Sequence, residues 1–178
     1  MLRTVTHVTP ANETIEEVEI IRAHKEGILH RAFSVYVFNP EKTKLLTQKR
    51  SQQKMLWPGY AANTCCSHPR GEEDVVQSGE RRLKEEMGFT TSLTLGPSFV
   101  YRADDPFGNG IEHEYDILLL GTVPESMTIN PDPKEAQSFA WESIEDLMRR
   151  CADNDPNLTP WLIFGLPKVL ASTTFSMA

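Results

Sequence analysis

The sequence lacks several features that would mark whole classes of protein. Its 178 residues hold 10 Gly, 12 Pro and an ordinary 24% of charged residues, with no repeated unit or low-complexity tract. This composition excludes collagen-like, coiled-coil and wholly disordered chains. No apolar run reaches the roughly 18 residues that a membrane helix needs, and Met1 to Thr4 carry no apolar stretch typical of a signal peptide. We therefore expect a cytoplasmic protein that does not bind membranes.

Positive charge and cysteine are also scarce. The chain has 18 Lys and Arg against 25 Asp and Glu, a formal net charge of -7, so its overall field argues against nucleic acid as a partner. The 3 cysteines form an odd number, and two of them, Cys65 and Cys66, are neighbours whose mutual disulfide would strain the backbone. At least one thiol is expected to be free, which favours a reducing compartment.

What remains is the composition of one globular domain. The chain is 39% hydrophobic, and a chain of this length can bury roughly 70% of its unfolded surface, enough for a core with a dry pocket. We expect a single domain over residues 1–178 and a monomer. Residues 1–20 are interpreted as an N-terminal segment that covers the pocket.

The residue pattern predicts an α+β fold, with strands around one clear helix. Aromatic and β-branched residues predict a hairpin of strands at 30–38 and 44–49, and further strands near 92–103, 111–123 and 137–142. A helix is predicted from Glu73 to Met87, closed by Gly88. Two more helices are predicted, one starting at Ser143 and one running from Thr159-Pro160 toward Leu170.

The segment from Asn63 to Pro69 holds the sharpest chemical signal. Alternate residues of an extended chain share a face, so Cys66 and His68 should lie together while Cys65 points elsewhere. A thiol beside an imidazole can be a metal-binding pair, an activated nucleophile, or an acid/base thiol next to a metal-held histidine. Ordinary buried cysteines beside a surface histidine are the alternative.

The same alternation places Glu112 and Glu114 on one face, roughly 7 Å apart along the strand. If that face is exposed to solvent, keeping both carboxylates ionised costs little free energy. If it points inward, a divalent metal is the simplest way to keep both carboxylates ionised. His24 and His30 flank a predicted turn and could complete a site of three histidines and two carboxylates with His68, although a lone histidine is more often structural.

Charges on the predicted helix and before it suggest an anion site. At 100° per residue, Glu86 falls on the apolar stripe of the helix, where it needs either a basic partner or a bound cation. Arg82 also points inward. Between residues 42 and 54 the chain has no acidic residue and five basic ones, which are either a solvated hairpin edge or donors for a phosphate group: Lys42, Lys44, Lys49, Arg50 and Lys54.

These pieces resemble a known family. N-T-C-C-S-H-P, G-I-E-H-E-Y-D, H-R-A-F-S-V and T-P-W are similar to the type 1 isopentenyl-diphosphate delta-isomerases over about residues 20–170. That family shares the Nudix fold of mixed β-sheets flanked by helices, which implies a single Nudix-like isomerase domain here. The predicted helix resembles a Nudix box in which Ser67 replaces the opening glycine and Arg82 replaces the first catalytic glutamate, which disfavours hydrolysis.

The resemblance implies conversion of isopentenyl diphosphate, a small prenyl diphosphate, to dimethylallyl diphosphate in isoprenoid biosynthesis. Cys66 and Glu114 correspond to its two proton-transfer groups on opposing faces, which exchange donor and acceptor roles with the direction of the reaction. Tyr101 corresponds to a hydrogen-bonding residue near the acid side. Trp161 corresponds to an aromatic ring that stabilises a carbocation-like state.

The resemblance also implies binding residues. Those for the diphosphate are Arg50, Lys54 and Arg82. One divalent metal, Mn²⁺, Zn²⁺ or Mg²⁺, would be held by His24, His30, His68, Glu112 and Glu114. A second ion, Mg²⁺, would join the diphosphate to Glu86 and to the backbone carbonyl of Cys66.

Two other functions stay open. One is a Nudix-type hydrolase of a nucleoside or prenyl diphosphate, which would release phosphate. The other is a non-catalytic zinc-binding or sensor protein that uses Cys66 and the three histidines, with a closed coordination shell and no turnover. The tail from Ser172 to Ala178 carries no functional signal.

Overall fold

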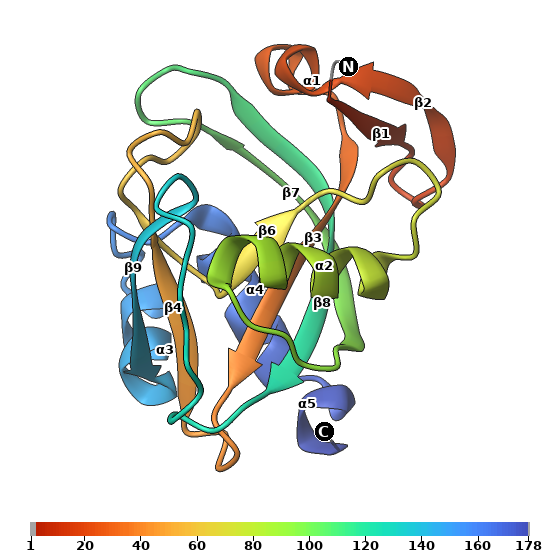
Figure 1. Cartoon of the computed structure of the whole chain (residues 1–178). Coiled ribbons are helices and arrows are strands. Elements are labelled where there is room, and N and C mark those ends of the chain that lie inside the picture. The colour runs from red at the N-terminus through yellow and green to blue at the C-terminus, as the bar shows by residue number, and fades with distance from the viewer. Residues whose placement is uncertain (1–2, 178) are drawn as a thin grey trace.

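A mixed sheet of nine strands organises the chain (Figure 1). The computed structural model describes residues 3–177; Met1 and Leu2 of the predicted covering segment and Ala178 of the tail lie outside them. The strands are β1 (Thr4–Val8), β2 (Thr14–Glu19), β3 (His30–Phe38), β4 (Lys44–Arg50), β5 (Ala61–Ala62), β6 (Cys65–Ser67), β7 (Thr94–Asp104), β8 (Ile111–Thr122) and β9 (Ala136–Ser143). The helices are α1 (Ile20–Glu26), α2 (Val75–Met87), α3 (Ile144–Ala152), α4 (Pro160–Leu170) and α5 (Thr173–Met177).

Strand β3 is the centre of this sheet. It pairs in parallel with β8 from His30↔Glu114 to Phe38↔Thr122, and antiparallel with the short strand β6. Strand β8 pairs in turn with β7, and β4 pairs with β9. The parallel β3–β8 pair inside an otherwise antiparallel arrangement makes the sheet mixed, and the predicted α+β class is confirmed.

The predicted hairpin of 30–38 and 44–49 is confirmed next to its turn, where the two strands pair antiparallel, but the pairing does not continue along the strands. β3 and β4 meet only at Phe38↔Leu45, directly after the turn. Beyond that position β3 is occupied by β6 and β8, while β4 pairs with β9 from Lys44↔Ser143 to Arg50↔Ala136. The two strands therefore diverge and leave room for the segment that follows β4.

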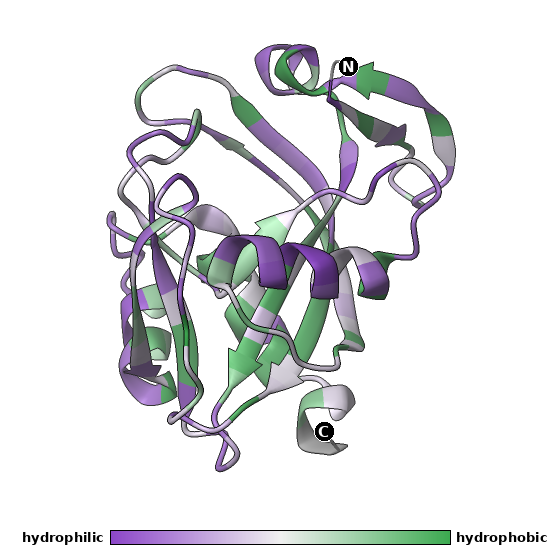
Figure 2. Ribbon diagram, viewed as in Figure 1, coloured by the Kyte–Doolittle hydropathy of each residue, from purple (hydrophilic) through white to green (hydrophobic). Residues whose placement is uncertain are grey.

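Helices cover both faces of the central strands. The residues of β3 that point to either face are therefore mostly hydrophobic, as is typical of strands buried on both sides. One face packs against α2 through a core that includes Phe33, Val35, Leu83, Met87 and Leu119. The other face packs against α4 through a core that includes Tyr36, Phe38, Leu118, Leu162 and Leu166. Figure 2 shows hydrophobic residues on β3 and β8 beneath α2 and hydrophilic residues on the outward side of that helix.

Helix α2 was predicted within two residues. It begins at Val75 because the side chain of Asp74 accepts hydrogen bonds from the backbone nitrogens of Val76 and Gln77. It ends at Gly88, whose φ of 76° is left-handed and whose missing Cβ would meet the backbone of Asn130. The prediction of a glycine-closed helix is confirmed.

The N-terminal region is the part that local pattern missed. Strand β2 and helix α1 were not predicted, and His24, expected beside a turn, lies in the last turn of α1 before left-handed Gly27. Figure 1 shows β1, β2 and α1 together at one end of the molecule. Within residues 3–177, no helix is long and apolar enough to cross a membrane.

Candidate active site

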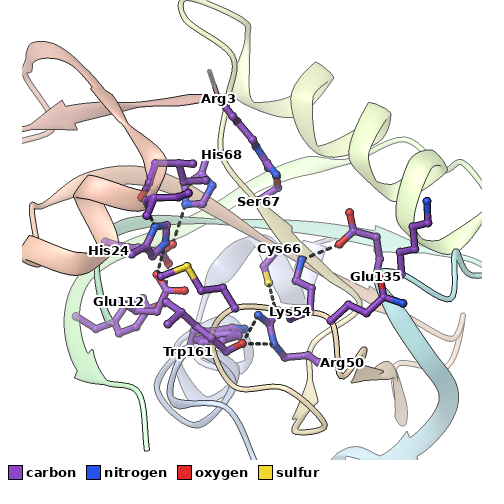
Figure 3. A pocket seen from close by; sticks show the side chains of 18 residues that line it. Arg3, His24, Arg50, Lys54, Cys66, Ser67, His68, Glu112, Glu135 and Trp161 are labelled. Atoms are coloured by element: carbon purple, nitrogen blue, oxygen red, sulfur yellow. Dashed lines mark hydrogen bonds and ion pairs between the residues drawn. The ribbon is translucent and has the colours of Figure 1, made fainter. Parts of the chain in front are cut away.

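A cavity of about 480 Å³ lies where α1, β6, β7, β8, α4 and the loop after β4 converge. Predicted site residues on its walls are His24, Arg50, Lys54, Cys66, His68, Tyr101, Glu112, Glu114 and Trp161. His30 lies directly behind this wall, whereas Arg82 and Glu86 lie outside it. The structure thus brings most of the predicted residues to one hollow, shown in Figure 3.

One end of the cavity is a histidine cluster, consisting of His24, His30, His68, Glu112 and Glu114. One ligand atom from each of the three histidines and from Glu114 lies within 4.8 Å of the others. The parallel register pairs His30 directly with Glu114, and His68 follows β6. Glu112 joins through His24, whose Nε2 lies 3.2 Å from Glu112 Oε2. Both glutamates are buried, so the inward alternative for this strand is confirmed.

Backbone carbonyls orient two of the rings. His24 Nδ1 donates to the carbonyl of Ile20 at 2.6 Å, and His30 Nδ1 donates to that of Ile28 at 2.8 Å. Each Nε2 therefore faces the cluster. His30 Nε2 lies 3.2 Å from His68 Nε2, which in turn lies 3.1 Å from Glu114 Oε1. Carbonyl contacts on the far ring nitrogen are the usual way in which metal-binding histidines are held.

The donors of this cluster fit a divalent cation. Imidazole nitrogens and carboxylate oxygens are the ligands of Zn²⁺, Mn²⁺ and related ions. In the described part of the chain, neither Glu112 nor Glu114 forms an ion pair with a lysine or arginine. Burial lowers the pKa of His68 to about 3 despite the nearby Glu114 carboxylate, and His68 Nδ1 is buried without a partner. A neutral imidazole is the form that binds a metal.

The thiol of Cys66 lies in an apolar wall. It packs against aromatic residues that include Trp57, Tyr101 and Trp161. Burial raises the pKa of Cys66 to about 12, although Arg50, whose Nη1 lies 3.7 Å from Sγ, acts in the opposite direction. Cys66 is therefore a protonated thiol at neutral pH. Cys65 points into the core beneath α2, as the alternation predicted.

Glu114 contributes a carboxylate to the same cavity. Burial opposes its ionisation, yet the neighbouring imidazoles of His30 and His68 hold the pKa of Glu114 well below its usual range. Its second oxygen, Oε2, accepts a hydrogen bond of 2.6 Å from the hydroxyl of Tyr101. Burial and the Glu114 charge raise the pKa of Tyr101, so the phenol keeps its proton. The cavity therefore holds a thiol and a carboxylate in opposite protonation states.

Trp161 enters the cavity from the first turn of α4, which Pro160 starts at its first position. Its ring is buried and meets Trp57 edge to face, with 5.4 Å between ring centroids. The Cζ atom of Arg50 lies 5.0 Å from the ring centroid of Trp161. The indole thus already faces one cation, consistent with an electron-rich wall.

The other end of the cavity is cationic. Arg50 donates to the backbone carbonyls of Leu56 and Trp57 at 2.8 and 3.1 Å, and Lys54 pairs with Glu135 at 2.7 Å. The basic stretch before residue 55 predicted these two cations. Three charged residues on the walls were missed because no local pattern marks them: Arg3, Lys134 and Glu135.

Arg82 and Glu86 belong to a second set of charges on and around α2, here called the arginine network. It consists of Arg81, Arg82, Glu73, Glu85, Glu86 and Glu135, of which Glu135 also lines the cavity. Glu86 is buried, as predicted, and Arg82 pairs with it and with Glu135. Of the two alternatives for Glu86, the structure has the basic partner. The residues as placed do not fit the second ion, because the carboxylate is engaged by Arg82.

The chain is similar to known proteins over most of its length. The family model described as NUDIX domain matches residues 28–162. An isopentenyl-diphosphate Delta-isomerase of Cereibacter sphaeroides is 39% identical over 162 residues, 89% of either chain. One from Halorhodospira halophila is 39% identical over 88% of this chain and 89% of its own. Isopentenyl-diphosphate Delta-isomerase 1 of Bos taurus is 36% identical over 84% and 72%.

Solved structures support the fold. A crystal structure from Deinococcus radiodurans has a TM-score of 0.75 at 16% identity, over 94% of this chain and 99% of its own. A MutT NUDIX hydrolase from Burkholderia pseudomallei has a TM-score of 0.62 at 18% identity, over 79% and 98%. At these identities the likeness concerns the fold alone.

Proposed function

The chain belongs to the NUDIX domain family and, within it, to the isopentenyl-diphosphate Delta-isomerases, and on this premise we propose which residues carry the reaction. The enzyme converts isopentenyl diphosphate to dimethylallyl diphosphate. One proton is added to the terminal methylene carbon of the double bond, and one is removed from the allylic CH₂ attached to the other double-bonded carbon, so the double bond moves by one position. Such a reaction needs two proton-transfer groups at one apolar site.

Cys66 and Glu114 are these two groups. The observation that carries the proposal is that both line one cavity, one as a thiol and the other as a carboxylate bound by Tyr101. In one direction the first group donates a proton as the second accepts one, and in the reverse direction the roles exchange. The proton taken from the substrate must return to the donor before the next turnover. Tyr101 holds the Glu114 oxygen in place.

Trp161 stabilises the tertiary carbocation-like state between the two transfers. An alkene is a weak base, so the transient cation must be kept from water and placed near a group that cannot attack it. The buried indole ring meets both needs, and cation–π contacts of this kind contribute about 2 kcal/mol or more in a desolvated site. Arg50, stacked on the same ring, then competes with the substrate cation for its electrons.

The diphosphate lies toward Arg50 and Lys54, at the cationic end of the cavity. Arg82 stays a predicted ligand of the diphosphate, and to reach it this side chain must leave Glu86 and Glu135. The three histidines with Glu112 and Glu114 would hold a divalent cation at the histidine cluster. Such a cation would stabilise the Glu114 carboxylate and lower the basicity of that group.

We also propose the metals: Mn²⁺, Zn²⁺ or Mg²⁺ at the histidine cluster, and Mg²⁺ with the diphosphate. We further propose that the protein is a monomer that acts in the cytoplasm, in isoprene biosynthesis. Three free cysteines in the described chain support a reducing compartment.

The two alternative functions have less support. A Nudix hydrolase needs helix carboxylates that are free to hold metal, and here Arg82 neutralises Glu86. A zinc-binding protein without catalysis would leave the Cys66 thiol and the buried ring of Trp161 in the cavity without a use.

The test is an assay with isopentenyl diphosphate, Mg²⁺ and Mn²⁺. We expect dimethylallyl diphosphate and no released phosphate from the wild type, and a loss of at least about 10³-fold in kcat for Cys66→Ala and for Glu114→Gln. The matched controls are Cys151→Ala and Glu145→Gln, which lie outside the cavity and should keep the wild-type rate. Release of phosphate by the wild type, or full activity of either cavity variant, would refute the proposal.

A further inference from the structure

Arg3 is a cation that reaches the cavity from an unexpected part of the chain. It directly precedes β1, and its side chain extends to Ser67, where Nη2 donates to Oγ at 3.2 Å (Figure 3). Ser67 lies between Cys66 and His68. The carbonyl of Arg3 accepts a hydrogen bond from Ile20 N at 3.0 Å, which fixes its backbone against the start of α1.

Most of the N–H donors of the Arg3 guanidinium have no partner among residues 3–177. In residues 3–177 no carboxylate lies within 4.0 Å of it, and Ser67 takes the one side-chain hydrogen bond that it donates. A guanidinium has five N–H donors arranged in a fork that fits phosphate or carboxylate oxygens. Two of the other cations nearby are engaged: Lys54 by Glu135, and Arg50 by two backbone carbonyls.

The electrostatic surroundings of Arg3 favour an added anion. Burial and the charge of Arg82 lower the pKa of Arg3, while the charges of Glu135 and Glu86 act in the opposite direction. Arg3 shares the cavity walls with Arg50 and Lys54, and cations that share one cavity repel each other, a cost that a bound anion removes. Lys134 adds a further positive charge on the same walls.

We propose that Arg3 is a substrate-binding residue that contacts the diphosphate, so that bound substrate fastens the β1–β2 hairpin and α1 to the rest of the cavity. This inference rests on the proposed function, because it takes the anion to be the diphosphate of the isomerase substrate. The segment at the start of the N-terminal strand thus contributes to substrate binding. Ile20 and Ile21, which follow the same hairpin, line the cavity beside it.

The test measures binding of inorganic pyrophosphate in the presence of Mg²⁺ by calorimetry. We expect Arg3→Ala to weaken this binding about tenfold or more, because one charge-assisted, forked contact is lost. Arg3→Lys keeps the charge without the fork and should lose less, whereas Arg3→Gln should fall close to Arg3→Ala. The control is Arg22→Ala, an exposed arginine paired with Glu26 outside the cavity, which should stay within twofold of the wild type.

If Arg3 had only a structural role, its replacement would lower the thermal midpoint in the absence of ligand. A role in binding predicts a different pattern. We expect the thermal midpoint of Arg3→Ala without ligand to equal that of the wild type, and the upward shift caused by pyrophosphate to shrink. With isopentenyl diphosphate, KM should rise while kcat stays nearly constant. Unchanged pyrophosphate binding in Arg3→Ala, no pyrophosphate binding by the wild type, or an equal loss in Arg22→Ala would overturn the inference.

The two proposals fail separately. Pyrophosphate binding needs no turnover, so a wild type that binds it through Arg3 but makes no dimethylallyl product would refute the proposed roles of Cys66 and Glu114 and keep Arg3 as an anion-binding residue. An active isomerase whose Arg3→Ala variant binds pyrophosphate normally would refute the role of Arg3 alone.

Discussion

The histidine cluster and the arginine network each contain at least one buried carboxylate, and they differ in which groups neutralise it. In the arginine network, Glu86 pairs with Arg82, and Glu73 pairs with Arg81 at 2.8 Å. In the histidine cluster, Glu114 contacts only imidazole nitrogens and the hydroxyl of Tyr101 among the described residues. One region carries its own cations and the other is suited to an added one.

The comparison explains how the helix of a diphosphate-binding fold can serve a different reaction. Arg82 stands where the resembling motif has a catalytic glutamate, and its guanidinium occupies the carboxylate that a metal would use. The histidine cluster, which we propose as the metal site, lies instead on α1, β3 and β8 and directly after β6, beside the thiol. We expect changes in the arginine network to affect stability and changes in the histidine cluster to affect metal binding.

The largest stability effect is expected at Arg82. Arg82→Met leaves Glu86, whose side chain is 2% exposed, without its cation. Breaking a buried pair in this way costs about 3 kcal/mol, and we expect that loss in the free energy of unfolding measured in urea. The control, Arg149→Met, breaks an exposed pair with Asp146 and should change stability by less than about 0.5 kcal/mol.

A double variant sharpens this prediction. Arg82→Met with Glu86→Leu replaces both charges by apolar groups and should recover most of the loss, because no unpaired charge stays buried. If Arg82→Met alone unfolds at the wild-type urea concentration, Arg82 does not neutralise Glu86, and the contrast between the two regions disappears.

The second prediction concerns the histidine cluster. His68→Ala should reduce the affinity for Mn²⁺ or Zn²⁺ by at least about 10- to 100-fold and abolish the rise in thermal midpoint that the metal causes in the wild type. Metal content by mass spectrometry and thermal unfolding with added metal are the measurements. His7→Ala, outside the cluster, serves as control. Equal metal binding by His68→Ala and the wild type would contradict the assignment.

The smallest effect is a pH dependence at Glu73. The hydrogen bond from Arg81 lowers the pKa of Glu73 to about 2, below the ordinary value of 4.5. A carboxylate with a lowered pKa adds stability above its unfolded pKa and loses it as pH falls toward the folded one. Screening of this partly open pair limits the contribution to about 1 kcal/mol.

Glu73→Gln should therefore be less stable than the wild type at pH 7, with a difference that shrinks between pH 4.5 and 2. Urea unfolding at pH 7, 5 and 3 measures it. Glu72→Gln changes an exposed neighbour for which residues 3–177 provide no ion pair, and it should show no such trend. A difference for Glu73→Gln that stays constant with pH would show that the ion pair is not its cause.

Local sequence predicted the elements better than their partners. Helix α2 was found because Gly88 ends a clear apolar stripe, and each long strand was found from its β-branched and aromatic residues. The pairing of β4 with β9 was missed because it joins residues about 90 positions apart, and the turn after Phe38 favours β3 as the partner of β4. Helix α1 was missed because its seven residues are too few for a periodic pattern.

The same distinction applies to the site. Alternation along an extended strand correctly placed Cys66 with His68 and Glu112 with Glu114, because side-chain direction there depends on the backbone alone. Arg3 and Glu135 were missed because their place in the cavity depends on how a hairpin and a loop pack, which no local spacing records. Arg82 was found to point inward, but its partners became visible only in three dimensions.

The central claim is that Cys66 and Glu114 act together as one proton-exchanging pair. The most direct measurement is the isomerisation rate of Cys66→Ala, Glu114→Gln and the double variant under identical metal and substrate concentrations. When two groups act as a unit, the loss of either one already removes their joint contribution to the rate. We therefore predict that the double variant is no slower than the slower single variant. A double variant slowed by the product of the two single losses, or a single variant at the wild-type rate, would contradict the claim.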